Sequence, residues 1–372
     1  MKQKYYIILI LIIGFNQKAK AQDPVYSQFY YNRLEMNPAF AGADGNGKLR
    51  LNPFHRNIYR PIKGPFNSSS LSLDYGLCSA NIGIGFIASN ERQGDGFLST
   101  TKIDFILSKL IQIDRYNQLS IGGNLGFIFQ DLDWSKYTFS DQYDPIFGNV
   151  RPSVNSNIVS DFSNARHLNL GINYTGWHYS KRVSWNIGIA GNNLITKPQL
   201  GYINTYILPE RYTAYGGLSF HSNPSLISNS LRIFTRFDMQ ANYKTNILLS
   251  EYYLSDNLNL GIGYRATSYN TSDINSLIFS MGLQPENSIK IIMSYEQNIT
   301  AVTTAATFEL GLIWIPDQEL CAGNGLFNFI GGRRRGGGGR RGFFGLGGGS
   351  TKKRINCPVW GNDRREKFIA PY

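Results

Sequence analysis

A hydrophobic pattern with a period of two recurs along most of this chain, and it is fullest between Thr304 and Pro316. One face of that segment becomes steadily more apolar and consists of Thr304, Ala306, Phe308, Leu310, Leu312 and Trp314. The other face is small or polar and consists of Ala305, Thr307, Glu309 and Gly311. The alternation predicts a β-strand, and an apolar face that ends in tryptophan is expected at a membrane interface. Because a soluble β-sandwich strand can alternate in the same way, the membrane interpretation depends on repetition of the pattern.

Comparable segments precede this one, and together they predict about fourteen strands. They span residues 48–59, 70–76, 81–89, 101–111, 119–130, 168–174, 183–189, 212–220, 231–240, 246–254, 258–264, 274–283, 289–296 and 304–315. The first is the poorest because Pro53 interrupts it. An even number of strands is usual in single-chain bacterial barrels. Glycines on the inner faces are interpreted as an allowance for strongly coiled strands in a narrow barrel.

Composition favours the same fold class. Charged residues make up only 17% of the 372 residues, against about 25% in typical soluble proteins. Aromatic residues make up 14%, and outer-membrane barrels carry aromatic girdles at both interfaces. Beyond the N-terminal leader no apolar run is long enough for a transmembrane helix, so a membrane-spanning fold has to be a barrel. We therefore predict an all-β protein, a transmembrane antiparallel β-barrel over residues 48–316.

The predicted connections differ in length between the two ends of the barrel. Short connections at one end fall near Cys78, Asp114, Tyr179, Asn223, Asp256 and Glu286. At the other end several are long, as in residues 130–164 and 192–210. Outer-membrane barrels have short periplasmic turns and longer outer loops. With an even strand number, the N- and C-termini of the mature chain are both expected in the periplasm.

The first 47 residues are predicted to form two segments. Residues 1–21 have a basic start (Lys2, Lys4), an apolar run over residues 7–15 and a small-x-small site at residues 19–21, as in a signal peptide for export. Residues 22–47 contain two prolines and several large aromatic side chains that need burial. We expect this segment to be ordered and to lie against or inside the periplasmic end of the barrel, as a plug would.

The C-terminal region is basic and differs from the barrel in composition. From Asp317 onward, 11 lysines and arginines stand against 4 acidic residues. Residues 317–354 are rich in Gly and Arg and predict a flexible linker, and residues 355–372 regain aromatic residues and predict a docking segment. The partner-binding residues expected there are Arg333, Arg334, Arg335, Arg340, Arg341, Trp360, Phe368 and Tyr372. Peptidoglycan, the lipid surface or an acidic protein face are the candidate partners, a solvated spacer is the alternative, and export argues against nucleic acid.

Three cysteines, Cys78, Cys321 and Cys357, are present, and their spacing matches no metal site. All three are expected in the periplasm, where disulfides persist. Because Cys321 and Cys357 bracket the linker, a disulfide between them is predicted, which would leave Cys78 unpaired.

Catalytic and metal-binding patterns are weak. His167 lies near Ser160 and Ser163, but its place at the mouth of a strand favours a solvated polar residue over a hydrolase site. Four aspartates in the longest connection, Asp131, Asp133, Asp141 and Asp144, have oxygen ligands suited to Ca²⁺, but their spacing matches no EF-hand. The sequence therefore predicts a non-enzymatic protein with no cofactor.

The start of the mature chain resembles the PorP/SprF family of outer-membrane proteins from the type IX secretion system of Bacteroidetes. The signature residues are Asp23, Pro24, Tyr26, Ser27, Gln28, Asn37, Pro38, Ala39, Phe40 and Gly42, and residues 208–212 (LPERY) are similar to a later element of the family. The resemblance covers roughly residues 22–316 and does not extend to the tail.

This resemblance implies a barrel that works with the type IX secretion and gliding machinery. It would either anchor or help to export a cell-surface adhesin through the adhesin's C-terminal domain, or bind the periplasmic ring of lipoproteins. The alternative is an outer-membrane transporter or channel for a small hydrophobic or sugar-like solute, since inner-face Gly, Asn and Ser would leave room for a pathway.

Overall fold

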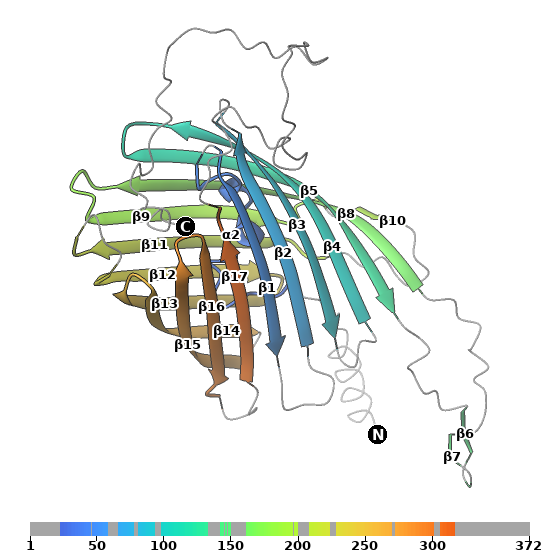
Figure 1. Cartoon of the computed structure of the whole chain (residues 1–372). Helices are drawn as coiled ribbons and strands as arrows, with labels where there is room; N and C mark the ends of the chain where they lie inside the picture. The colour runs from blue at the N-terminus through green and yellow to red at the C-terminus, as the bar shows by residue number, and fades with distance from the viewer. Residues whose placement is uncertain are drawn as a thin grey trace, which may run out of the picture.

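The computed structural model describes residues 23–45, 47–58, 66–77, 81–93, 98–132, 142–144, 146, 148–149, 161–195, 197–199, 208–223, 228–269, 272–300 and 306–316. Its main sheet has fifteen strands, of which the short β10 (Lys197–Gln199) is appended to β8 and the other fourteen form a closed antiparallel ring (Figure 1). The ring strands are β1 (Leu49–Ile58), β2 (Phe66–Leu77), β3 (Ile82–Gln93), β4 (Leu98–Gln112), β5 (Asn117–Leu132), β8 (Asp161–Trp177), β9 (Val183–Asn192), β11 (Arg211–His221), β12 (Ser230–Gln240), β13 (Tyr243–Ser255), β14 (Leu258–Tyr269), β15 (Ser272–Glu286), β16 (Ile289–Asn298) and β17 (Ala306–Trp314). The predicted fold class and strand number are confirmed.

Each ring strand pairs with its neighbour in sequence, and β17 returns to β1. A small hairpin of β6 (Tyr143–Asp144) and β7 (Gly148–Asn149) lies outside the ring. The interruption predicted at Pro53 is wrong, because β1 runs through this residue with unbroken pairing to β2. On its other side the pairing to β17 passes from Leu51 to Phe54, so the missing N–H of Pro53 is accommodated there.

The two faces of the wall differ in the way that the alternation predicts. On β4 the outward side chains of Phe105 and Leu107 are 55% and 61% exposed, whereas Asp104 before them and Ser108 after them point inward and are buried. An apolar outer face and a polar inner face are the arrangement of a transmembrane barrel. None of the helices in the described residues is long and apolar enough to cross a membrane.

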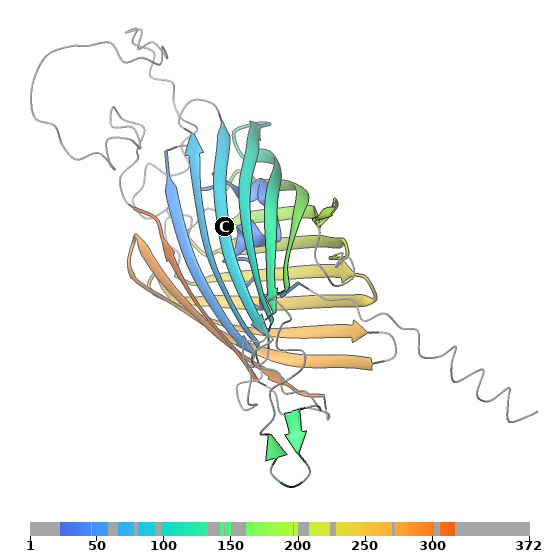
Figure 2. The same ribbon diagram turned by 90° about the vertical axis from the view of Figure 1, so that its right-hand side faces the viewer.

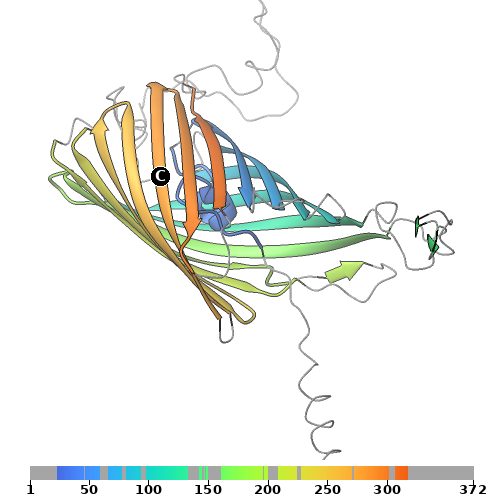
Figure 3. The same ribbon diagram turned by 90° about the horizontal axis from the view of Figure 1, so that it is seen from below.

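The interior of the ring is filled by residues 23–45, which we call the luminal segment. It contains one helical turn, α2 (Arg33–Met36), and the 3₁₀ turn η1 (Pro38–Phe40). Both lie among the strands in Figure 2, and Figure 3, a view from below, places them inside the ring. Most of the segment is buried, so the hydrophobic core of this protein lies where its N-terminal residues meet the inner wall.

The luminal segment runs from one end of the barrel to the other. Asp23 lies beside Arg211 and Asn193, which flank the long connection of residues 193–210. Gly47 pairs with Gly76 at the opposite end, where β1 begins and where Pro316 follows β17. The expectation that both ends of the mature chain lie on one side is therefore corrected for the described residues. An even number of strands places residues 48 and 316 together, but the preceding segment passes through the lumen to the other end.

Candidate functional site

The 3₁₀ turn of the luminal segment is joined to three adjacent strands through Asn37. Its side-chain oxygen accepts the N–H of Ala39 at 2.8 Å, which caps the turn. Its amide nitrogen lies 3.1 Å from the carbonyl oxygens of Ile172 on β8 and Ile189 on β9, and 2.8 Å from the hydroxyl of Tyr215 on β11. Asn37 therefore spans the β8–β9 pairing that closes the barrel.

Glycines on the inner wall make room for the same turn. A Cβ at Gly122 would lie 2.6 Å from backbone atoms of Pro38 and Ala39. A Cβ at Gly83 would overlap the carbonyl group of Ala41, and one at Gly171 would overlap the side chain of Asn37. The explanation of inner glycines by a narrow barrel is therefore corrected at these positions, because it is the close approach of the luminal segment that excludes a side chain.

Asp23 lies in a buried cluster of charged and polar groups at the start of the luminal segment. Its carboxylate pairs with Lys102 on β4, accepts a hydrogen bond from Asn193 at 2.7 Å, and lies 3.7 Å from a guanidinium nitrogen of Arg211. Its backbone N–H donates to Gln240 on β12 at 3.0 Å. Two cations therefore face the carboxylate, and Asp23 is tied to β4, to the start of β11 and to the end of β12.

A polar cavity of about 30 Å³ adjoins this cluster, and Asp23, Glu35, Lys102 and His167 are among the residues that line it. His167 on β8 is buried and does not lie in an exposed loop, which corrects the sequence interpretation. Its Nε2 pairs with Asp104 on β4, and its Nδ1 lies 3.2 Å from the side-chain oxygen of Asn193. The cavity has space for water-sized molecules only. The imidazole of His167 contacts a carboxylate and a side-chain amide rather than a serine hydroxyl.

The next turn of the luminal segment is held through its main chain. One carboxylate oxygen of Glu309 on β17 accepts the N–H of Ser27 at 2.8 Å, and the other accepts the N–H of Gln28 at 3.0 Å. The same carboxylate lies 3.2 Å from Nε of Arg56 on the neighbouring strand β1. The Ser27 hydroxyl donates to Glu296 on β16 at 2.6 Å. The charged groups here belong to the wall, and the luminal segment supplies the amides and a hydroxyl.

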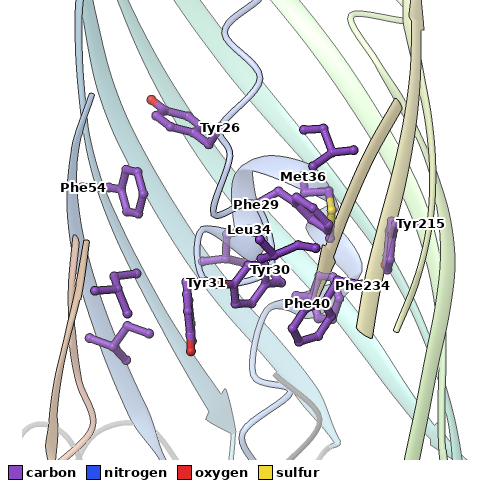
Figure 4. Close-up of a cluster of buried hydrophobic side chains, with 14 of the residues drawn as sticks. Tyr26, Phe29, Tyr30, Tyr31, Leu34, Met36, Phe40, Phe54, Tyr215 and Phe234 are labelled. Atoms are coloured by element: carbon purple, nitrogen blue, oxygen red, sulfur yellow. The ribbon is translucent and has the colours of Figure 1, made fainter. Parts of the chain in front are cut away.

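Two adjacent tyrosines fit the middle of the lumen (Figure 4). The ring of Tyr30 stacks on Phe234 of β12 with centroids 4.3 Å apart, and its hydroxyl donates to Glu251 on β13. The Tyr31 hydroxyl donates to the other oxygen of Glu251 at 3.1 Å and accepts from Lys290 on β16 at 2.6 Å. Burying two phenols in this way is favourable because each hydroxyl finds a charged partner.

The end of the luminal segment is joined to β1 and β2. Arg33 pairs with Asp44 within the segment and lies 3.6 Å from Asp74 on β2. Asp74 also accepts the N–H of Gly42 at 3.1 Å. Gly42 has a φ of +68°, and a Cβ there would lie 2.7 Å from Cα of Gly83, so both conformation and space require glycine.

The signature residues named from the sequence all fall within the luminal segment. Tyr26 packs edge-on against Phe54, Phe40 packs against Tyr215, and Ser108 donates to the carbonyl of Ala41. Pro24 is half-buried, and Pro38 begins the 3₁₀ turn. In the LPERY element, Arg211 reaches Asp23, and the carbonyl of Pro209 accepts a hydrogen bond from Gln240. Two stretches that lie far apart in the sequence therefore meet at one end of the lumen.

The sequence did not allow us to predict which wall residues contact the luminal segment. They are charged residues on the inner face of the ring strands, chiefly Arg56, Lys102, Glu251, Arg265, Lys290, Glu296 and Glu309. The signal that identifies them is a charge at the inward position of the period-two pattern. The signal peptide, the three cysteines and the whole tail, including the predicted disulfide and partner-binding residues, lie outside the described residues.

Metal binding finds no support in the described part of the chain, where no group of three or more His, Cys, Asp or Glu side chains is arranged to hold an ion. Of the four aspartates weighed for Ca²⁺, Asp133 and Asp141 lie outside the described residues.

This chain is similar to one protein family and to several solved structures. A family model described as "Type IX secretion system membrane protein PorP/SprF" matches residues 18–314. A comparison with curated protein sequences gives no match. Similar solved structures include the CymD monoaromatic hydrocarbon channel, with 9% identity, 81% of this chain and 95% of that chain covered, and a TM-score of 0.43. The P. putida toluene transporter TodX has 8% identity, coverage of 75% and 91%, and a TM-score of 0.38. A Pseudomonas aeruginosa FadL homologue has 13% identity, coverage of 78% and 94%, and a TM-score of 0.39.

Proposed function

Because the chain belongs to the PorP/SprF family of type IX secretion system membrane proteins, we propose that it is a non-enzymatic accessory of that system in the outer membrane. In this role the barrel anchors or helps to export a cell-surface adhesin through the adhesin's C-terminal domain, or binds the periplasmic ring of lipoproteins. Membership in the family confirms the resemblance seen in the sequence.

The filled lumen is the observation that carries this proposal. The luminal segment is tied to strands around the ring, from Lys102 on β4 to Glu251 on β13 and Glu309 on β17. The cavity beside Asp23 holds about 30 Å³, which is far below the several hundred Å³ of a site for a small organic ligand. A barrel filled in this way acts through its ends and its outer face, as an anchor or adaptor does.

Partners at the two ends differ under this proposal. The end with the short turns faces the periplasm, so the basic tail that follows Pro316 would meet the secretion ring or peptidoglycan there. Its arginines would pair with acidic groups, and its terminal aromatic residues would dock in a pocket. The long connections at the other end would meet the exported adhesin. Outer-membrane lipids contact the apolar outer face between them.

A pull-down from the native outer membrane tests the proposal. The full-length protein and a variant that lacks residues 333–372 are recovered, and their partners are identified by mass spectrometry. We expect an adhesin or the ring lipoproteins with the full-length protein, and loss of the ring lipoproteins without the tail. Recovery of the barrel alone from both preparations would contradict the accessory role.

The alternative is a transporter for a small hydrophobic or sugar-like solute. It requires the luminal segment to leave or to move, since the two cavities that described residues line beside this segment, of about 30 and 10 Å³, are too small for such a solute. Loss of solute uptake in a deletion strain whose adhesin display stays normal would favour this alternative.

A further inference from the structure

The wall of the lumen recognises the main chain of its occupant as well as its side chains. Glu309 accepts two successive N–H groups, those of Ser27 and Gln28, and on the adjacent strand Arg50 and Asn52 donate to the carbonyl of Tyr31 at 2.6 and 2.9 Å. Hydrogen bonds to amides and carbonyls do not depend on which side chains the peptide carries. These wall groups would therefore bind another peptide that entered in the same conformation.

The main-chain acceptor is held in place by the barrel itself. Glu309 pairs with Arg56 on the neighbouring strand, and Glu296 pairs with Arg265 at 3.3 Å. All four residues belong to the ring, so both pairs can form without the luminal segment. A preformed site of this kind binds its ligand without first having to be organised.

Side-chain contacts restrict the ligand to a narrow class. Glu251 accepts hydrogen bonds from the two adjacent phenols of Tyr30 and Tyr31, and Phe234 supplies the stacking surface for the first ring. Lys290 lies 4.6 Å from the ring centroid of Tyr31 and donates to its hydroxyl. The lumen therefore recognises two consecutive tyrosines by their side chains, and it binds the preceding Ser27 and Gln28 through their backbone N–H groups.

The occupant is poorly matched to the wall at one position. Gln28 is 1% exposed, and among the described residues neither atom of its side-chain amide has a hydrogen-bond partner. A buried amide with no partner loses its hydration without compensation. A peptide with an apolar side chain at this position would avoid that loss and would bind the same lumen more tightly.

We propose that the lumen is a peptide-binding site that the luminal segment occupies in cis, and that its ligand in trans is a segment of an exported partner protein that adopts the same turn, in which the carbonyl of Gln28 accepts the N–H of Tyr31. That segment carries two consecutive tyrosines, with an apolar residue two positions before the first. The exported origin of this partner rests on the proposed function. The peptide chemistry rests on Glu309, Glu251, Lys290 and Gln28.

The test uses the full chain with a protease recognition sequence inserted at residue 46. This position is chosen because a Cβ at the neighbouring Gly45 would meet no atom within 4 Å. After purification the connection is cut, and retention of the folded barrel is checked by its mobility on unheated gels. Synthetic peptides of residues 23–45 with an N-terminal fluorophore are then added, and their exchange into the cut barrel is followed by fluorescence anisotropy.

We expect the peptide with Gln28→Leu to half-saturate the barrel at about one tenth of the concentration that the unchanged peptide needs, because one unpaired buried amide is removed. Changing both tyrosines to phenylalanine should raise the half-saturating concentration about tenfold or more, because two charge-assisted hydrogen bonds are lost. In a barrel with Glu251→Gln, the difference between the tyrosine and phenylalanine peptides should shrink, which separates recognition by Glu251 from a general loss of packing.

The inference is overturned if no peptide exchanges into the cut barrel, if a scrambled peptide binds as well as the unchanged one, or if Gln28→Leu gives no gain. Should exchange fail while the uncut protein still recovers secretion components from the membrane, only this inference is lost. Failure of both experiments would remove the proposed function as well.

Discussion

At the scale of single residues, the fit between the luminal segment and the wall depends on side chains that are missing as much as on those that are present. Gly122 faces the backbone of Pro38 and Ala39, and a Cβ there would lie 2.6 Å from atoms that cannot rotate away. Gly216 on β11 is different, because its nearest neighbour to such a Cβ would be 3.8 Å distant. Gly122 lies on the inner face of the wall and Gly216 on the outer face, so the second serves as a control for adding a methyl group to a strand.

Gly122→Ala is expected to push the 3₁₀ turn off the wall and to destabilise the barrel by about 1–3 kcal/mol, the usual cost of overpacking. Gly216→Ala should change stability by no more than about 0.5 kcal/mol. Urea unfolding of both variants, followed by gel mobility without heating, measures the difference. Limited proteolysis should also cut residues 23–45 faster in the first variant. Equal stability and equal proteolysis would show that the turn does not pack against this strand.

At the scale of elements, the period-two pattern was sufficient to predict the strands and insufficient to predict what they enclose. Lipid on one face and polar contacts on the other impose an alternation that can be read locally, so all fourteen ring strands were recognised. The luminal segment has no such period. Its position follows from pairs such as Asp23 with Gln240, which are 217 residues apart, and a single sequence does not show which residues will meet.

The inner-face charges illustrate the same limit. Glu309 was assigned to the polar face of the last strand, but its role as acceptor for two N–H groups of the luminal segment depends on the location of that segment. His167 was placed at the mouth of a strand, because the length of β8 beyond its pairing with β9 could not be foreseen. A charged residue at an inward position of the period-two pattern can be recognised in the sequence. Its role depends on which residue it contacts in the folded protein.

Asn37 joins the 3₁₀ turn to β8, β9 and β11, and its replacement gives a prediction at the scale of elements. Asn37→Ala removes the hydrogen bonds to β8, β9 and β11 together, and it should destabilise the barrel by about 1–3 kcal/mol because buried acceptors lose their donor. Tyr215→Phe removes one of these contacts and should cost less. Thermal unfolding of the two variants compares them. A loss in Asn37→Ala no larger than that in Tyr215→Phe would mean that the turn does not join these strands.

At the scale of the whole molecule, the barrel has an end with short turns and an end with long connections, and we propose that the former faces the periplasm. In a cysteine-free background, Asn242→Cys at the turn between β12 and β13 should react with a membrane-impermeant maleimide on intact cells. Asn257→Cys, at the turn between β13 and β14, should react only after the outer membrane is permeabilised. The reverse pattern of labelling would invert the orientation and place the basic tail at the cell surface.

We propose that the luminal segment blocks the lumen, and that the protein therefore serves type IX secretion as an accessory and not as a channel. Single-channel recording of the full-length protein in planar bilayers tests it most directly. We predict essentially no conductance for the unchanged protein and brief openings for Gly122→Ala, whose luminal segment is loosened. A stable conductance like that of an open porin, in the unchanged protein and with its luminal segment intact, would contradict the claim.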